Sequence, residues 1–257
     1  MRTQRLKAQG LALLVAAASL MACSSPRPQP YNVSDPEQSR IARAATMAAY
    51  QRGKEIWFSP TIGTNGRTCE SCHPGGEMTR AEAYPRYKHV LRGVATLSMT
   101  HNFAVVNESR GQPWELGSDD ANAIALFVTS LANGKKVNIS TPSGIEKEWA
   151  ARGSRHFADP SLGTTGKSCL SCHNIRDNVS RDPNTGAPGL KGVTAYYPKY
   201  SFRHGRVVTV EQQVNYCLEH HMGAVPWPLD SKAMVELVAY LAALSEGTKV
   251  RVAVFDQ

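Results

Sequence analysis

The sequence lacks the features that would place it in several common classes of protein. It has no run of about twenty apolar residues that could cross a membrane as a helix, because Gly10–Ala22 is only thirteen residues long. It has no basic patch interleaved with aromatic residues, which argues against nucleic acid as a partner. Cysteine is scarce as well, at 6 of 257 residues, so the position of each cysteine is informative.

Four of the six cysteines form two copies of one motif, Cys69-Glu70-Ser71-Cys72-His73 and Cys169-Leu170-Ser171-Cys172-His173. In C-x-x-C-H, two thiols add across the vinyl groups of one haem and the histidine ligates its iron. A single copy would also fit a redox or zinc dithiol, whereas two copies in a repeated frame favour haem. The sequence therefore predicts two covalently bound c-type haems. Their attachment residues and proximal ligands are Cys69, Cys72, His73, Cys169, Cys172 and His173.

The two motifs lie within a tandem repeat. Before the motif the units align at an offset of one hundred, as Gly63-x-x-Gly66 and Gly163-x-x-Gly166 show. After it they align at an offset of 113, as Pro113-Trp114 and Pro226-Trp227 show. The second unit thus carries an insertion, and its polar stretch Asp177–Gly189 is typical of a surface loop.

Each unit is predicted to end in an amphipathic helix. Ser118 and Ser231 are placed as N-caps, and Gly134 and Gly247 are placed as C-caps. Between the N-cap and the C-cap of each helix, apolar residues recur at helical spacing.

Another helix is predicted before each motif, carrying Gly53 or Gly153, where the missing side chain allows a second helix to approach closely. This layout resembles the all-α class I cytochrome c fold, so we expect two tandem class I cytochrome c domains. Their predicted boundaries are 46–134 and 145–257, with a linker at 135–144.

The N-terminus predicts a signal peptide over residues 1–22, in which basic residues precede the apolar run. The run ends Leu20-Met21-Ala22-Cys23, which resembles the bacterial lipobox and implies lipidation of Cys23. Ordinary cleavage that leaves Cys23 as a free thiol is the alternative. Residues 23–45 would form a lipid-anchored flexible tether. Ser24 next to the anchor suggests, by resemblance, the periplasmic side of a Gram-negative outer membrane.

The basic composition carries little further information. Three of the positive charges belong to the signal peptide, and the four propionates of two haems would bring the remaining charge near zero. The formal charge of +8 is therefore no evidence for a polyanionic partner.

Cys217 is the cysteine that neither the motifs nor the N-terminus explains. Thr209 and Gln212 form a capping-box pattern, and a helix that starts there places Val210, Val214 and Cys217 on one inward face. A buried free cysteine is most often a small apolar residue.

The context of this cysteine points to a chemical role. Cys217-Leu218-Glu219-His220-His221-Met222-Gly223, followed by Asp230-Ser231-x-x-Met234, resembles the distal-cysteine segment of the SoxA and thiosulfate dehydrogenase cytochromes. The resemblance implies that the Cys217 thiolate ligates the second haem iron and is the catalytic group. Met222 is the alternative ligand, as in electron-transfer cytochromes. The thiosulfate dehydrogenases carry their thiolate in the N-terminal unit, whereas this chain carries it in the C-terminal unit, as SoxA does.

In the first unit, Ala104 aligns with Cys217, so no thiolate is available. His101 lies one turn earlier on the same helical face and is the predicted distal ligand of the first haem. Met99 is the alternative. Lys88, His89 or an open site are further possibilities.

Apart from Arg92, which aligns with Gly205, the basic residues of this segment accompany the cysteine in the second unit. Arg203, His204 and Arg206 stand where the first unit has Val90, Leu91 and Gly93. They predict a binding site for a small oxyanion, although such residues also bind haem propionates or form a solvated face.

These residues favour a diheme oxidoreductase that oxidises, or reversibly converts, a small sulfur anion such as thiosulfate. Electrons would pass through the first haem to a periplasmic cytochrome or another acceptor. The alternative is a lipoprotein that only relays electrons. A diheme peroxidase is disfavoured, because no segment is identified that would supply its calcium site.

Overall fold

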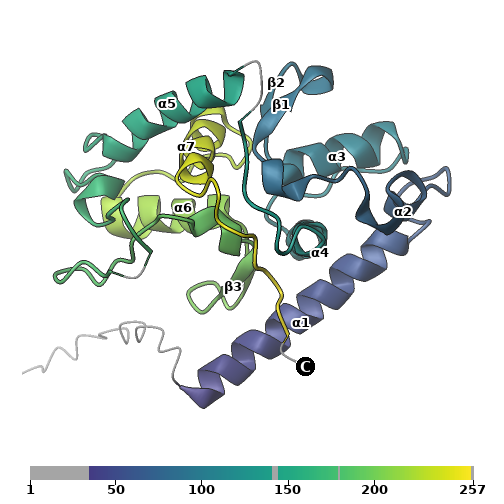
Figure 1. The fold of residues 1–257 in the computed structure, drawn as a ribbon, viewed down its shortest axis with the longest axis horizontal. Helices are drawn as coiled ribbons and strands as arrows, with labels where there is room; N and C mark the ends of the chain where they lie inside the picture. The colour runs from purple at the N-terminus through teal and green to yellow at the C-terminus, as the bar shows by residue number, and fades with distance from the viewer. Residues whose placement is uncertain (1–34, 141–143, 179, 256–257) are drawn as a thin grey trace, which may run out of the picture. The chain divides into compact units, whose positions relative to one another are not determined.

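The structure, a computed structural model, describes residues 35–140, 144–178 and 180–255 (Figure 1). Cys23 and the predicted signal peptide lie outside the described residues. The helices are α1 (Pro36–Phe58), α2 (Cys69–Cys72), α3 (Leu97–Asn107), α4 (Asp119–Ser130), α5 (Ile145–Ala158), α6 (Val210–Cys217) and α7 (Lys232–Ala243). The strands are β1 (Arg86–Lys88), β2 (Gly93–Ala95), β3 (Lys199–Ser201) and β4 (Arg206–Val208). Within the described ranges, no helix is both long and apolar enough to span a membrane.

The two units contain the same elements in the same order. Helices α1, α3 and α4 of the first correspond to α5, α6 and α7 of the second. Each unit adds a short antiparallel hairpin, with Tyr87 opposite Val94 in β1–β2 and Tyr200 opposite Val207 in β3–β4. The mostly helical architecture is confirmed. The hairpins escaped prediction because three residues per strand are too few for a period of two to register.

The predicted N-caps of the final helices are confirmed. The Ser118 hydroxyl accepts a hydrogen bond from the backbone N–H of Ala121, and that of Ser231 accepts one from Met234, both at 3.3 Å. The predicted C-caps were wrong, because both helices end about one turn before the glycines. α4 and α7 end at residues 130 and 243, and Gly134 and Gly247 adopt positive φ beyond them, where they start the paired segments described below.

Gly53 and Gly153 lie where the first and last helices of each unit cross. A Cβ atom on Gly53 would sit 2.1 Å from the carbonyl oxygen of Ala123, and one on Gly153 would sit 1.9 Å from that of Glu236. These distances are far inside van der Waals contact, so the prediction of close helix approach is confirmed. In Figure 1, α5 and α7 lie side by side, as do α1 and α4.

The first helix starts earlier than predicted. Asp35 caps it by accepting hydrogen bonds from the backbone N–H groups of Glu37 and Gln38, with Pro36 at the first helical position. Residues 36–45 are therefore helical, which corrects the prediction that the tether reaches residue 45. The Pro-rich composition concealed this start, because proline is well accepted in a first helical turn.

The predicted linker is also part of the fold. Its first residues pair with the end of the chain, and every bond has a counterpart 113 positions away. Gly134 N–H donates to Val250 O and Gly247 N–H to Val137 O. Val137 N–H donates to Thr248 O and Val250 N–H to Lys135 O. This pairing between the two units is therefore self-complementary, the arrangement of a two-fold symmetric interface.

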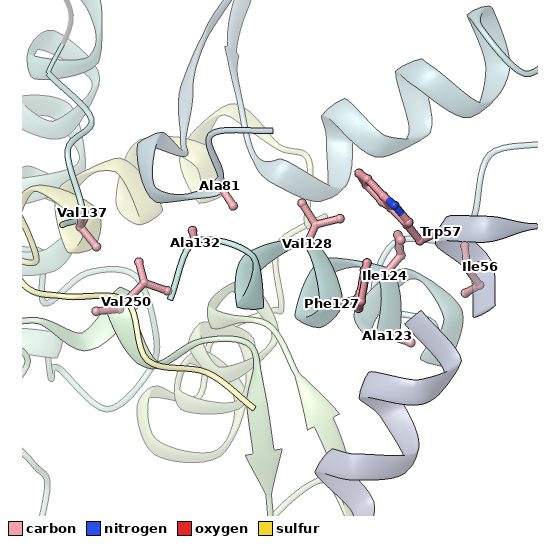
Figure 2. Close-up of a cluster of buried hydrophobic side chains, with 11 residues drawn as sticks. Ile56, Trp57, Ala81, Ala123, Ile124, Phe127, Val128, Ala132, Val137 and Val250 are labelled. Atoms are coloured by element: carbon pink, nitrogen blue, oxygen red, sulfur yellow. The ribbon is translucent and has the colours of Figure 1, made fainter. Parts of the chain in front are cut away.

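The core of the first unit extends into this contact (Figure 2). Trp57, Phe127 and Ile124 pack where α1 crosses α4, and the same cluster continues through Val137 to Val250 of the second unit. A second cluster around Phe157, Met234 and Leu237 occupies the matching place between α5 and α7. The haem motifs border both clusters, since Cys69 and Cys169 pack against them.

The helix crossing yields the first prediction. Gly153→Ala should lower the free energy of unfolding by about 1–3 kcal/mol, because the new methyl group would meet the Glu236 carbonyl and push α5 away from α7. Thermal or denaturant unfolding of the holoprotein measures this loss. Arg155→Ala, at an exposed site on the same helix, is the matched control. A Gly153→Ala protein at least as stable as the wild type would contradict the crossing.

Candidate haem sites and active site

Both haem motifs sit on short, capped helical turns. The Thr68 hydroxyl accepts a hydrogen bond from the Ser71 N–H at 2.9 Å, and Ser168 forms a capping box with Ser171. Cysteines three positions apart on such a turn lie on one side of it. All the cysteines of the described ranges are free thiols, so none of the four motif cysteines is tied in a disulfide there.

The motif histidines are both oriented through Nδ1. His73 Nδ1 lies 2.9 Å from the carbonyl oxygen of Glu77, and His173 Nδ1 lies 2.8 Å from that of Pro188. A protonated Nδ1 donating to a carbonyl leaves Nε2 as the basic nitrogen, which is how a ligating imidazole is normally held. The residues present therefore fit the proximal side of a c-type haem in both units. In the second unit, the predicted insertion supplies the carbonyl.

His101 faces the first motif from α3. Burial lowers the pKa of His101 to about 4, and the nearby charge of His73 adds to the effect. Its Nδ1 atom is buried and has no hydrogen-bond partner among the described residues. A neutral imidazole opposite His73 fits a distal iron ligand.

The other predicted candidates of the first unit make different contacts. Met99 occupies the first turn of α3, where its N–H donates to the capping Thr96 hydroxyl at 3.4 Å. Lys88 Nζ donates to the Tyr84 hydroxyl at 3.3 Å, and His89 is exposed, with its ring edge against Tyr87.

The register of the two distal helices is fixed by a matching pair of contacts. Asn102 Nδ2 donates to the Trp114 carbonyl at 2.7 Å, and Asn102 Oδ1 accepts from the Trp114 N–H at 2.9 Å. Asn215 makes the same two bonds with Trp227 at the same distances. This equivalence aligns Ala104 with Cys217, as predicted from the sequence. The capping box of Thr209 and Gln212 is confirmed as the start of α6.

Cys217 faces the second motif. It is the last residue of α6, and the chain continues as the π turn η6 (Leu218–Met222), whereas α3 continues unbroken to Asn107. Burial raises the pKa of the Cys217 thiol, and two neighbours oppose this rise. Gln213 Nε2 donates to its sulfur at 3.7 Å, and the Arg203 guanidinium contributes positive charge.

Cys169 of the second motif is also close to Cys217. Burial raises the pKa of Cys169 to about 12, and the charge of Cys217 is the next cause. Burial also raises the pKa of Tyr197, again with Cys217 as the second cause. Cys169 and Tyr197, from two different segments, thus both lie near the Cys217 sulfur. A π turn was not predictable from the sequence, although such turns are frequent at functional sites.

Met222 lies in an apolar cluster next to the same motif. Its side chain is 3% exposed and packs with Leu218 and Ala224, against a rim that includes Cys169 and Trp227. Its carbonyl is held against Gly163, as that of Ser109 is held against Gly63 in the first unit. Met222 is therefore close enough to the motif to remain the alternative ligand. Its side chain packs as a core residue does.

The predicted anion-binding residues separate into two groups. Arg203 and His204 gather around Tyr216, which precedes Cys217 on α6. Arg203 Nη1 donates to the Tyr216 hydroxyl at 3.2 Å, and the His204 ring meets the Tyr216 ring edge-on with centroids 5.4 Å apart. Arg206 instead pairs with Asp119 of the first unit at 2.9 Å, so it helps to dock the two units.

Two further histidines join this group and were not predicted. His220 stacks on Tyr216 with centroids 4.1 Å apart, and His221 meets the same ring edge-on at 5.8 Å. Burial lowers the pKa of His221, and Arg203 is the next cause. The sequence could have pointed to them, because the second unit has two adjacent histidines where the first unit has Asn107 and Glu108.

A repeated helical unit with a capped C-x-x-C-H turn, an anchored histidine and a crossing of its first and last helices defines a tandem c-type cytochrome. The family model described as SoxA/TsdA, cytochrome c domain, matches residues 52–137 and 152–250. The chain belongs to this family. Its domains are therefore cytochrome c domains, which carry covalently bound haem iron.

Curated relatives and a solved structure agree with this assignment. A thiosulfate dehydrogenase of Allochromatium vinosum is 34% identical over 114 residues, which cover 42% of each chain. An L-cysteine S-thiosulfotransferase subunit SoxA of Rhodovulum sulfidophilum is 39% identical over 92 residues, covering 36% of this chain and 29% of the relative. These matches thus span less than half of either relative. SoxXA from P. pantotrophus has the same fold, with a TM-score of 0.69 and 20% identity over 83% of this chain and 81% of that one.

Proposed function

We propose that this protein is a diheme c-type cytochrome that oxidises, or reversibly converts, a small sulfur anion such as thiosulfate. One observation carries the proposal: two otherwise matched sites differ at the distal position. The second unit presents Cys217 and Arg203, and the first presents Ala104 and Val90 at the same places. The relatives, a thiosulfate dehydrogenase and an L-cysteine S-thiosulfotransferase subunit, support a substrate of this class.

The residues that would hold the haems follow from the contacts above. The first set is Cys69, Cys72 and His73 with His101, and the second is Cys169, Cys172 and His173 with Cys217. When bound, the haem irons supply one-electron acceptors whose potentials depend on their axial ligands, and which can pass electrons to a periplasmic cytochrome.

Burial raises the pKa of the Cys217 thiol, and two neighbouring side chains oppose that rise. The Gln213 amide and the Arg203 guanidinium both lower the pKa of the thiol, against the effect of burial. A Cys217 thiolate would repel a sulfur dianion. A guanidinium at the same place offsets that repulsion and can bind an oxyanion through two parallel hydrogen bonds. In the overall reaction, two thiosulfate anions form one S–S bond and release two electrons, with no proton exchanged.

The second prediction concerns the number of haems. Mass spectrometry of the mature protein should show two covalent haem additions, because both units carry an anchored C-x-x-C-H. Cys172→Ala should weaken attachment of the second haem alone, and Cys72→Ala, its matched control, that of the first alone. Recovery of one haem per wild-type chain would contradict the tandem assignment.

The third prediction joins the distal ligands to turnover. In electron paramagnetic resonance of the oxidised protein, Cys217→Ala should abolish a thiolate low-spin signal and lower thiosulfate turnover about a hundredfold or more, because it removes an anionic ligand and the reacting sulfur. His101→Ala should change only the other haem's signal, and Met99→Leu should change neither.

Two outcomes would favour an electron relay with Met222 as ligand instead. One is a Cys217→Ala protein that keeps its spectrum and its activity. The other is a wild type that exchanges electrons quickly with cytochromes but converts no sulfur anion.

The fourth prediction concerns location, which we propose to be the periplasmic side of a Gram-negative outer membrane, through a lipid on Cys23. Cys23→Ser should leave the protein unlipidated and shift it from the membrane fraction to the soluble fraction, because the acyl chains are the proposed anchor. Fractionation and intact mass measure both effects. A Cys23→Ser protein bound as firmly as the wild type would contradict the anchor.

A further inference from the structure

Tyr216 contacts Arg203 in two independent ways. Its hydroxyl accepts a hydrogen bond from Arg203 Nη1 at 3.2 Å, and its ring lies under the guanidinium, with Arg203 Cζ 5.1 Å from the ring centroid. A cation over an aromatic face is attracted by the ring quadrupole. A long, exposed arginine side chain is otherwise free to adopt many rotamers, so two contacts from one residue restrict where its charge can lie.

The ring of Tyr216 is itself held in place. His220, one helical turn further on, stacks on it with an interplanar angle of 8°, and its Nδ1–H donates to the Tyr216 carbonyl oxygen at 3.1 Å. His204 and His221 meet its edges. The ring is therefore a fixed surface rather than a mobile side chain.

This surface belongs to the residue next to the cysteine proposed to act in catalysis. Tyr216 immediately precedes Cys217 in the last turn of α6, so the Arg203 guanidinium that it contacts is held against the helical turn that carries the thiol. In the first unit, which has no cysteine, the equivalent residues are Phe103 for Tyr216, Val90 for Arg203 and Asn107 for His220. Every member of the group is thus present only beside the cysteine.

We infer that Tyr216 is a positioning residue that fixes the Arg203 guanidinium beside Cys217, where it binds the sulfur anion and raises the reduction potential of the second haem. The first consequence rests on the proposed function. The second does not, because a positive charge near the iron favours the reduced state whatever the substrate is.

The test compares four variants of the holoprotein. Tyr216→Phe removes the hydroxyl and keeps the ring, Tyr216→Leu removes both, Arg203→Ala removes the charge, and Phe103→Leu is the matched control in the first unit. The measurements are KM and kcat for thiosulfate, and the potential of each haem by redox titration without substrate.

Arg203→Ala should raise KM about tenfold or more, Tyr216→Leu nearly as much and Tyr216→Phe about threefold, with kcat changed much less. The second haem's potential should fall in the same order, and the first haem's should stay constant. Phe103→Leu should change none of these quantities.

The outcomes separate the two proposals. If Arg203→Ala changes KM and potential while both Tyr216 variants match the wild type, the positioning role is overturned. If the wild type converts no thiosulfate but Tyr216→Leu and Arg203→Ala lower the second potential together, the positioning role stands and the proposed function fails. If neither residue affects the potential or KM, both the anion site and its support are excluded.

Discussion

Backbone contact between the first and last helix of each unit is the constraint on which the rest of the structure depends. At Gly53 and Gly153 the helices touch so closely that no side chain fits between them. This crossing sets the spacing between the capped motif turn, which follows the first helix, and the distal helix, which precedes the last. A haem ligated from both sides would take one ligand from each segment, so the distance between these two segments decides whether such ligation is possible.

The two units share one arrangement of helices and differ by a small number of residues around the distal position. The Asn–Trp contacts keep α3 and α6 in one register, so the substitution of Ala104 by Cys217 places a thiol where the first unit has a methyl group. Around it, the π turn, Gln213 and the group on Tyr216 supply hydrogen bonding and positive charge. One unit thus offers two imidazoles, and the other offers an imidazole and a sulfur in a cationic setting, without any change of fold.

Much of this arrangement could be predicted from the sequence because it depends on local signals. The C-x-x-C-H motifs, the capping residues Ser118, Ser231 and Thr209, and the repeat offsets are short patterns with direct physical causes. Contacts between segments far apart could not be predicted in this way. The ion pair of Arg206 with Asp119, the pairing of residues 134–137 with 247–250, and the gathering of His220 and His221 on Tyr216 all depend on how helices and turns meet in space.

The insertion in the second unit gives its proximal histidine a different dependence from that of the first. His73 is oriented by a carbonyl four residues away in a tight turn, but His173 is oriented by Pro188, at the end of an exposed loop closed by the Arg181–Pro188 bridge and the Asp182 turn. The orientation of the His173 imidazole therefore depends on the conformation of a surface segment. A change in the conformation of that loop would reorient the second histidine and leave the first unchanged, so only one of the two histidines depends on surface structure.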